Sequence, residues 1–286
     1  MEFEGSSSVV TGGGNGIGRA LCLELAKHGS NVAVSDIELA SAESVAAEVE
    51  ALGVKAMAIQ TDVASEDSVA SLADSAWNGF GSVDILVNNA GVVPPTGPLF
   101  ATSAADFDWI FSVNVGGVMN GIRTFIPRFI EAGRPARVLT TASEHSLGIA
   151  HLGVGLYTAS KHALLGLSDV LRREVPEHIQ ISVLCPGLVD STLWKALERR
   201  QDSFGGAGEV SDTVGAFMQH IGMSAEEVAQ RTTAELSKGT FLIVTHPHGL
   251  ELARERWDSI NAAFSEQAPR FEGDEKWDLN RIQASQ

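Results

Sequence analysis

Basic residues, cysteines and long apolar runs are all scarce in this chain, and each shortage excludes a class of protein. Lysine and arginine number 20 against 36 aspartates and glutamates, which gives a formal net charge of −16. Without a basic stripe, the sequence lacks the electrostatic footprint of a nucleic-acid-binding protein and of a protein drawn to anionic membranes. No window reaches the roughly 18 apolar residues of a membrane span. The opening residues also lack the basic and apolar regions of a signal peptide. We therefore expect a soluble, cytoplasmic protein.

The few cysteines and histidines predict neither a disulfide nor a metal centre. Cys22 and Cys185 are the only cysteines, and both lie in apolar runs, which favours buried thiols over a disulfide. His246 and His248 flank a proline, but no third and fourth ligand follows at a suitable spacing. With 286 residues, 44% of them hydrophobic, the chain is long enough to bury a large core without such crosslinks.

Short apolar runs alternate with amphipathic stretches along most of the chain. The expected strands are residues 8–11, 31–35, 56–60, 84–87, 137–141, 179–184 and 240–245. The expected helices include residues 16–28, 41–52, 65–80, 157–174 and one long helix over 105–130. Apolar strands separated by helices predict an α/β fold, a doubly wound, Rossmann-like parallel sheet of about seven strands. We expect one domain over residues 1–286, with its binding crevice at the carboxyl ends of the strands.

Two stretches fall outside this alternation. Residues 191–237 form a helical insertion before the last strand, with a glycine-rich patch at 205–208 and scattered bulky apolar side chains. An insertion at the carboxyl edge of the sheet predicts a substrate lid, with a surface excursion as the alternative. Residues 250–286 add a C-terminal extension, a helix followed by a polar tail.

A glycine-rich loop, TGGGNGIG, joins the first expected strand to the first helix. Its glycines Gly12, Gly16 and Gly18 follow the pattern Gly-x-x-x-Gly-x-Gly rather than the strict Gly-x-Gly-x-x-Gly. Glycines let the backbone approach a pyrophosphate, and the helix N-terminus points at the anion. We therefore expect this loop, with Asn15 and Ile17, to bind a dinucleotide.

An acidic residue at the end of the second strand indicates which dinucleotide is bound. Asp36 stands eighteen residues past Gly18, where a carboxylate accepts hydrogen bonds from a ribose 2′-hydroxyl and repels a 2′-phosphate. No base precedes Gly16 in the loop, and the nearest one, Arg19, lies just past the last glycine. The sequence favours NAD over NADP. Asp36 can cap the following turn at the same time.

The chain contains a single tyrosine, Tyr157, four residues before Lys161 in the stretch YTASK. Residues four apart share one face of a helix, and an ammonium beside a phenol favours its ionised form, whose pKa is otherwise about 10. Such a phenol can transfer protons. The alternative is a partly buried tyrosine with a lysine whose aliphatic stem lies along it.

With TGGGNGIG, NNAG at residues 88–91, and Tyr157 with Lys161, the chain resembles the short-chain dehydrogenase/reductase family over residues 7–191. The resemblance implies an NAD-dependent oxidoreductase that interconverts a secondary alcohol and a ketone. The apolar candidate walls of the pocket, named below, suit a hydrophobic small molecule, aromatic, alicyclic or steroid-like. It also implies a homodimer or homotetramer paired through the helices at 105–130 and 157–174. Residues 106–135 and the extended C-terminal part look like the bacterial Cα-dehydrogenases, which oxidise benzylic secondary alcohols of lignin-derived aryl ethers.

The resemblance assigns roles to single residues. It implies that Tyr157 is the acid/base and that Lys161 grips the nicotinamide ribose while lowering the pKa of the phenol. Ser143 looks like the catalytic serine, and Asn114 like the asparagine that kinks the long helix and anchors a proton-relay water. The further cofactor contacts that the resemblance implies are Asp62 and Val63 at the adenine, Asn89 at the sheet edge, and Pro186, Gly187 and Val189 at the nicotinamide.

Two positions depart from the family pattern. Glu144 and His145 follow Ser143 in place of the usual small residues, which leaves Ser146 as a weak rival for the serine role. The position of a common family threonine is Ser191, with Thr192 next, so the hydroxyl that binds the nicotinamide amide stays open. The candidate walls of the substrate pocket, each with core packing as its alternative, are Val93, Pro94, Leu152, Leu188, Trp194 and Leu197.

Two other functions fit parts of the sequence. A ketoreductase that uses NADPH on a carrier-bound acyl chain would want a basic cofactor loop and a basic docking patch, and Asp36 and the −16 charge argue against both. A non-catalytic NAD-responsive binding protein would be indicated by loss of Tyr157 or Lys161, and both are present. Reduction of NAD in the presence of secondary alcohols would separate these possibilities.

Overall fold

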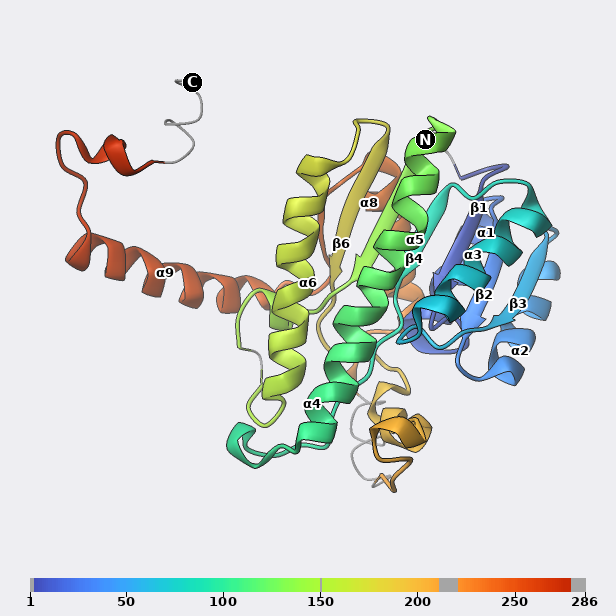
Figure 1. Cartoon of the computed structure of the whole chain (residues 1–286), viewed down its shortest axis with the longest axis horizontal. Coiled ribbons are helices and arrows are strands. Elements are labelled where there is room, and N and C mark those ends of the chain that lie inside the picture. Colours follow the sequence, from blue (N-terminus) through green and yellow to red (C-terminus); the bar gives the residue numbers. More distant parts are fainter. Residues whose placement is uncertain (1–2, 150, 211–220, 279–286) are drawn as a thin grey trace.

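The computed structural model describes residues 3–149, 151–210 and 221–278, and a parallel sheet forms the centre of this part of the chain (Figure 1). Its seven strands follow the order β3-β2-β1-β4-β5-β6-β7, all parallel. The strands are β1 (Ser7–Thr11), β2 (Asn31–Asp36), β3 (Ala56–Gln60), β4 (Ile85–Asn88), β5 (Ala136–Thr141), β6 (Ile179–Cys185) and β7 (Leu242–Val244). The order reverses between β1 and β4, as in a doubly wound sheet, so the predicted fold class is confirmed.

Helices cover both faces of the sheet. The described α-helices are α1 (Gly16–Lys27), α2 (Leu39–Glu50), α3 (Glu66–Phe80), α4 (Ala104–Ile110), α5 (Gly117–Ala132), α6 (Gly155–Glu174), α8 (Ala225–Lys238) and α9 (Gly249–Gln267), of which α9 lies away from the sheet. One apolar core joins α1, α2 and α8 to the sheet, and a second joins α3 and α5 to its other face (Figure 1). Cys22 lies in the first core, and both cysteines are buried and free, as their apolar contexts predict.

Local signals set the ends of these helices. The Ser65 hydroxyl accepts a hydrogen bond from the backbone N–H of Ser68 at the start of α3, and Gly81 ends that helix in the left-handed conformation. Acidic Glu66 and Asp67 occupy the first turn, where the helix dipole favours them.

The long helix expected over residues 105–130 is divided into three segments. A capping box between Ser103 and Asp106 starts α4, a π-helical segment spans Phe111–Gly116, and α5 follows. Asn114 lies inside the π-helical segment, where the extra residue per turn disturbs the regular hydrogen bonds. The expected kink at Asn114 therefore takes the form of a π-helical turn.

The expected insertion over 191–237 is only partly an excursion from the fold. Its last helix, α8, buries Val228, Ala229 and Leu236 in the same core as α1. This helix is the crossover between β6 and β7 and belongs to the sheet layers. The short 3₁₀ segments Leu193–Arg199 and Asp202–Phe204 lie outside those layers, and residues 211–220 lie outside the described part. Nothing tests the lid prediction for residues 191–237, so it stays a prediction, and its described stretch next to the site is residues 191–208 (the 191–208 segment).

The C-terminal extension leaves the body as a projecting helix, which Arg256 joins to His162 on α6 at 3.3 Å. In Figure 1, α9 projects away from the sheet beyond α6 and leads into a short 3₁₀ turn, Asp274–Trp277. Its large apolar side chains Leu250, Trp257, Ile260 and Phe264 are exposed. None of the described helices is both long and apolar enough to cross a membrane. The cytoplasmic location stays a prediction.

Candidate active site

The glycine loop lies at the carboxyl end of β1, against the loop that follows β4. Gly12 has φ +62°, and a Cβ there would lie 2.8 Å from the Cα of Ala90. The side-chain amide of Asn89 donates to the carbonyls of Thr11 and Gly12, at 3.1 and 3.2 Å, and its oxygen accepts from the Thr141 hydroxyl. Asn89 thus ties the ends of β1, β4 and β5 together, which agrees with its expected part in stabilising the sheet edge.

Asp36, the last residue of β2, is hydrogen-bonded to the same glycine loop. Its carboxylate is 5% exposed and accepts from the backbone N–H groups of Gly14, at 2.9 Å, and Glu38, at 3.1 Å. The contact with Glu38 is the turn cap that the sequence allowed. The guanidinium of Arg19 is turned away, toward Glu48 and Glu226 on α2 and α8. A further base, missed in the sequence, is Arg199 in the 191–208 segment, whose guanidinium lies 3.3 Å from the Glu38 carboxylate.

The first residues after β3 also contact the 191–208 segment. Asp62 Oδ1 accepts from the backbone N–H of Ala64, at 2.9 Å, and from the side-chain amide of Gln201, at 3.2 Å. The carbonyl of Val63 accepts from Asn120 on α5. Gln201 is therefore a residue to add to this side of the site, and only the tertiary structure brings it here.

Tyr157, Ser143 and Lys161 come together between the end of β5 and the start of α6. A hydrogen bond with the Ser143 hydroxyl acts to lower the pKa of Tyr157, but burial outweighs it and raises that pKa to about 12. The ammonium of Lys161 donates to the Thr141 carbonyl at 2.8 Å and lies 5.5 Å from the centroid of the phenol ring. Burial lowers the pKa of Lys161 to about 8. The expected lowering of the phenol pKa is therefore absent from the protein alone, because desolvation dominates.

Ser143 and Ser146, the two candidates for the catalytic serine, have different hydrogen-bond partners. Ser143 is hydrogen-bonded to the phenol of Tyr157, whereas the Ser146 hydroxyl donates to the backbone carbonyl of Lys161 at 2.7 Å. The geometry therefore favours Ser143 as the hydroxyl beside Tyr157.

Asn114 is fully buried and held at both ends of its amide. Its oxygen accepts from the Val92 N–H at 2.8 Å, and its nitrogen donates to the Val92 carbonyl and to the Ser160 hydroxyl, both at 3.0 Å. A Cβ on Gly91 would lie 3.4 Å from Asn114 Oδ1 and 3.5 Å from Lys161 Nζ. Asn114 Oδ1 and Lys161 Nζ thus both lie beside Gly91, and the proton-relay role of Asn114 stays a prediction.

The loop after β6 is held by a histidine from beyond β7. Nδ1 of His246 accepts from the Gly187 N–H at 2.9 Å, which leaves Nε2 to donate to the Leu188 carbonyl at 3.0 Å. The Pro186 carbonyl accepts from the Glu144 N–H at 2.8 Å, and Val189 is buried beside Met223. His246, unassigned from the sequence, therefore shapes the segment that was expected at the nicotinamide.

Ser191 and Thr192, the two candidate hydroxyls for the nicotinamide amide, differ in their contacts with the protein. The Thr192 hydroxyl donates to Asn15 Oδ1 at 2.7 Å, and Cβ of Ser191 lies 3.1 Å from the point that a Cβ on Gly16 would occupy. Thr192 is used to join the 191–208 segment to the glycine loop, so Ser191 is the hydroxyl with less protein contact.

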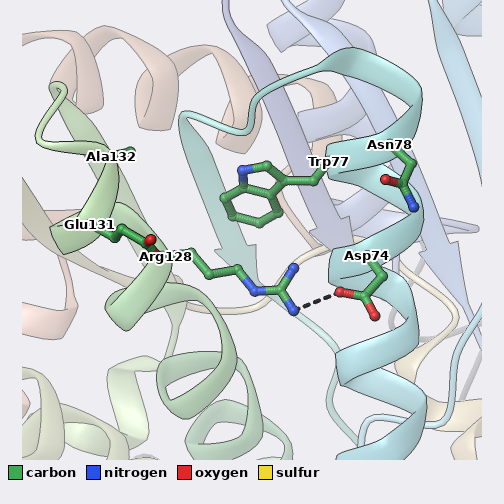
Figure 2. A pocket seen from close by; sticks show the side chains of 6 residues that line it. All are labelled: Asp74, Trp77, Asn78, Arg128, Glu131 and Ala132. Carbon is green, nitrogen blue, oxygen red and sulfur yellow. Dashed lines mark hydrogen bonds and ion pairs between the residues drawn. The ribbon is translucent and has the colours of Figure 1, made fainter.

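The residues expected to line the substrate pocket differ in their burial. Leu152 is 88% exposed, whereas Pro94 is buried and Leu197 packs against the second apolar core. A shallow hollow shown in Figure 2 lies elsewhere, between α3 and α5. The Arg128 guanidinium there lies 5.2 Å from the centroid of the Trp77 ring and pairs with Asp74 at 2.7 Å. This hollow contains none of the residues discussed above.

Comparison with known proteins identifies the family. The model of the short chain dehydrogenase family matches residues 7–202. The chain belongs to the short-chain dehydrogenase family. It is an oxidoreductase, and the predicted family resemblance is confirmed.

Two curated relatives and one solved structure match nearly the whole chain. The 1-deoxy-11-beta-hydroxypentalenate dehydrogenase of Streptomyces arenae is 32% identical over 91% of this chain and 89% of that protein. The C alpha-dehydrogenase of a Sphingobium species is 28% identical over 99% of this chain and 93% of that protein. A short-chain dehydrogenase from Burkholderia phymatum, solved in complex with NAD, superposes with a TM-score of 0.87 at 31% identity, over 95% of this chain and 99% of that one.

Proposed function

We propose that this dehydrogenase oxidises a secondary alcohol to a ketone, or reduces the ketone, with Tyr157 as the acid/base. The observation that carries the proposal is the cluster of Tyr157, Ser143 and Lys161 at the carboxyl edge of the sheet, beside the glycine loop. The hydrogen bond between Ser143 and the phenol presents two hydroxyl groups to one substrate oxygen. A protein that only bound a dinucleotide would not need this pair.

Side chains of the protein transfer the proton of the substrate hydroxyl. NAD, when bound, accepts the hydride from the carbinol carbon. Tyr157 in its phenolate form takes the proton of the substrate hydroxyl, and Ser143 donates a hydrogen bond to the same oxygen as it becomes a carbonyl. Lys161 and Asn114, both beside Gly91, pass the proton from the phenol toward water. A positioned acid/base of this kind typically contributes about 10²–10⁴-fold to the rate.

We propose NAD as the cofactor, held by the loop of Gly12, Gly16 and Gly18 and by Asp36. The buried carboxylate of Asp36 and the engagement of Arg19 with two glutamates support this choice, because a 2′-phosphate would meet an acid and no free base from α1. Asp62 and Val63 are proposed at the adenine, and Pro186, Gly187 and Val189 at the nicotinamide. The NAD complex of the Burkholderia relative supports the same cofactor.

Replacing Asp36 tests the cofactor assignment. We expect Asp36→Ala to raise the ratio of kcat/KM with NADP to that with NAD by about tenfold, which corresponds to about 1.4 kcal/mol of differential binding. Steady-state kinetics with both cofactors measure the ratio. Glu43→Ala, which removes an exposed acid on α2, is the matched control and should leave the ratio unchanged. An unchanged ratio in Asp36→Ala would contradict the ribose assignment.

We propose a hydrophobic, ring-bearing substrate whose secondary alcohol is benzylic or alicyclic. The names of two relatives support this class, one acting on hydroxypentalenate and the other at a Cα position. A panel of benzylic, alicyclic and steroid secondary alcohols, offered with NAD and followed by nicotinamide absorbance, tests it. Turnover of acyl-chain hydroxyl substrates alone would favour the ketoreductase, and no reduction of NAD by any of them would favour the binding protein.

We also propose that the chain forms a homodimer or homotetramer through α5 and α6. Ile130 at the end of α5 and Val170 on α6 are exposed apolar side chains at the outer surface of these helices, 46% and 52% exposed. Leu164, by contrast, is buried in the chain's own core, so the apolar residues of α6 serve two faces. Light scattering after size exclusion gives the subunit number, and a monomer at micromolar concentration would contradict the proposal.

A further inference from the structure

Glu144 is a buried carboxylate directly after Ser143, at a position that sequence reasoning marked only as a departure from the family pattern. The residue is 4% exposed. Its backbone N–H donates to the Pro186 carbonyl, and its Oε2 lies 2.8 Å from the point that a Cβ on Gly187 would occupy. The carboxylate is therefore enclosed between the Ser143 segment and the loop after β6.

Histidines from two other segments face this carboxylate. Nε2 of His248, the residue before α9, lies 2.8 Å from Glu144 Oε2, and Nε2 of His151 lies 4.0 Å from Oε1. The Glu144–His248 contact joins the start of α9 (its root, at His248) to the segment of Ser143. The titratable groups around Glu144 come from every element packed there, namely His145 beside it, His151 before α6, Tyr157 and Lys161 on α6, Cys185 on β6, and His246 and His248 after β7.

The charge on Glu144 acts on the phenol. Burial is the largest cause that raises the pKa of Tyr157, and the nearby negative charge of Glu144 raises it further. A buried charge interacts over a low-dielectric path, so the effect is stronger than that of an exposed acid at a similar distance. The groups paired with this carboxylate are the two histidines, His248 and His151, each of which carries a charge only when it is protonated.

We propose that Glu144 is a positioning residue for the proposed alcohol oxidation: paired with His248, it anchors the root of α9 to the catalytic segment and sets the pH at which Tyr157 becomes a base. The inference rests on the proposed function of Tyr157 for its effect on turnover. Its effect on the ionisation of Tyr157 does not depend on turnover. Since Tyr157 is the only tyrosine in the chain, tyrosinate absorbance reports that ionisation alone.

The test compares Glu144→Gln with the wild type in two measurements. Removing the carboxylate charge should shift the midpoint of the Tyr157 absorbance titration to lower pH by about one unit. The rising limb of kcat/KM for alcohol oxidation should move in the same direction, while circular dichroism confirms that both proteins stay folded over the pH range. A residue with a merely structural role would change stability without moving either midpoint.

A second variant keeps the test open if Glu144→Gln does not fold. His248→Arg changes a side chain that is 56% exposed and places beside Glu144 a guanidinium that stays charged at alkaline pH, so it should also shift both midpoints downward. Glu255→Gln, which removes an exposed charge on α9, is the matched control and should titrate like the wild type. Wild-type midpoints in the folded Glu144 and His248 variants would overturn the inference. Absence of turnover in the wild type would overturn the proposed function instead and leave the absorbance test intact.

Discussion

Tyr157→Phe should reduce kcat for alcohol oxidation by about 10³-fold or more while the fold and NAD binding stay intact. The substitution removes one hydroxyl, whose described partner is Ser143, and keeps the ring that lies against His145. Because the phenol oxygen is the proposed acid/base, no other side chain in the cluster can replace it. Steady-state kinetics measure the loss, and thermal unfolding with fluorescence titration of NAD verifies that the variant is otherwise intact.

The two serines supply the control for this result. Ser143→Ala should lower turnover strongly, since it removes the second hydroxyl at the substrate oxygen. Ser146→Ala removes a hydroxyl that donates to a backbone carbonyl of α6, so we expect a stability loss of about 1 kcal/mol and little change in turnover. Wild-type rates in Tyr157→Phe would refute the acid/base assignment, and the reverse order of the two serine variants would refute that of Ser143.

Gly18→Ala should destabilise the protein by about 3 kcal/mol or more and abolish NAD binding. A Cβ at this position would lie 1.9 Å from the Gly12 carbonyl oxygen and 2.6 Å from Asn89 Nδ2. The first contact is with backbone, which cannot rotate away, so the loop and α1 must separate. That movement would also break the Asn89 hydrogen bonds that hold the ends of three strands together. Chemical denaturation and NAD titration measure the two effects.

Gly97→Ala is the matched control for this prediction. A Cβ on Gly97 would meet no atom within 4 Å, and its φ lies outside the left-handed region. We therefore expect its free energy of unfolding to stay within about 0.5 kcal/mol of the wild type. Equal stability of the two alanine variants would show that the loop can open without cost, against the close packing of Gly18 on Gly12.

Features that depend on neighbouring residues were predictable from the sequence. The alternation of strands and helices was correct because each element carries its own apolar pattern, and the Ser65 cap and the glycine loop are contained in a few consecutive residues. The long helix was placed correctly but not its π-helical turn at Asn114, because the amide that occupies that turn is held by Val92, from the loop after β4.

Features that depend on burial or on distant segments were not predictable. The sequence placed a lysine beside the only phenol and indicated a lowered pKa, whereas desolvation raises it, and the extent of burial is set by the whole fold. Likewise, α8 was grouped with the lid because its crossover position is defined only by packing on α1.

By itself, the amino-acid sequence determined the fold class and the family, because periodicity and short motifs encode them locally, and it led to the predicted site residues through the family resemblance. The tertiary structure alone decided what surrounds those residues. It brought Gln201 to Asp62, His246 to Gly187 and His248 to Glu144, contacts that span 139, 59 and 104 positions of the chain. Charges and hydrogen bonds act through space, so the electrostatic environment of Tyr157 exists only once the chain has folded.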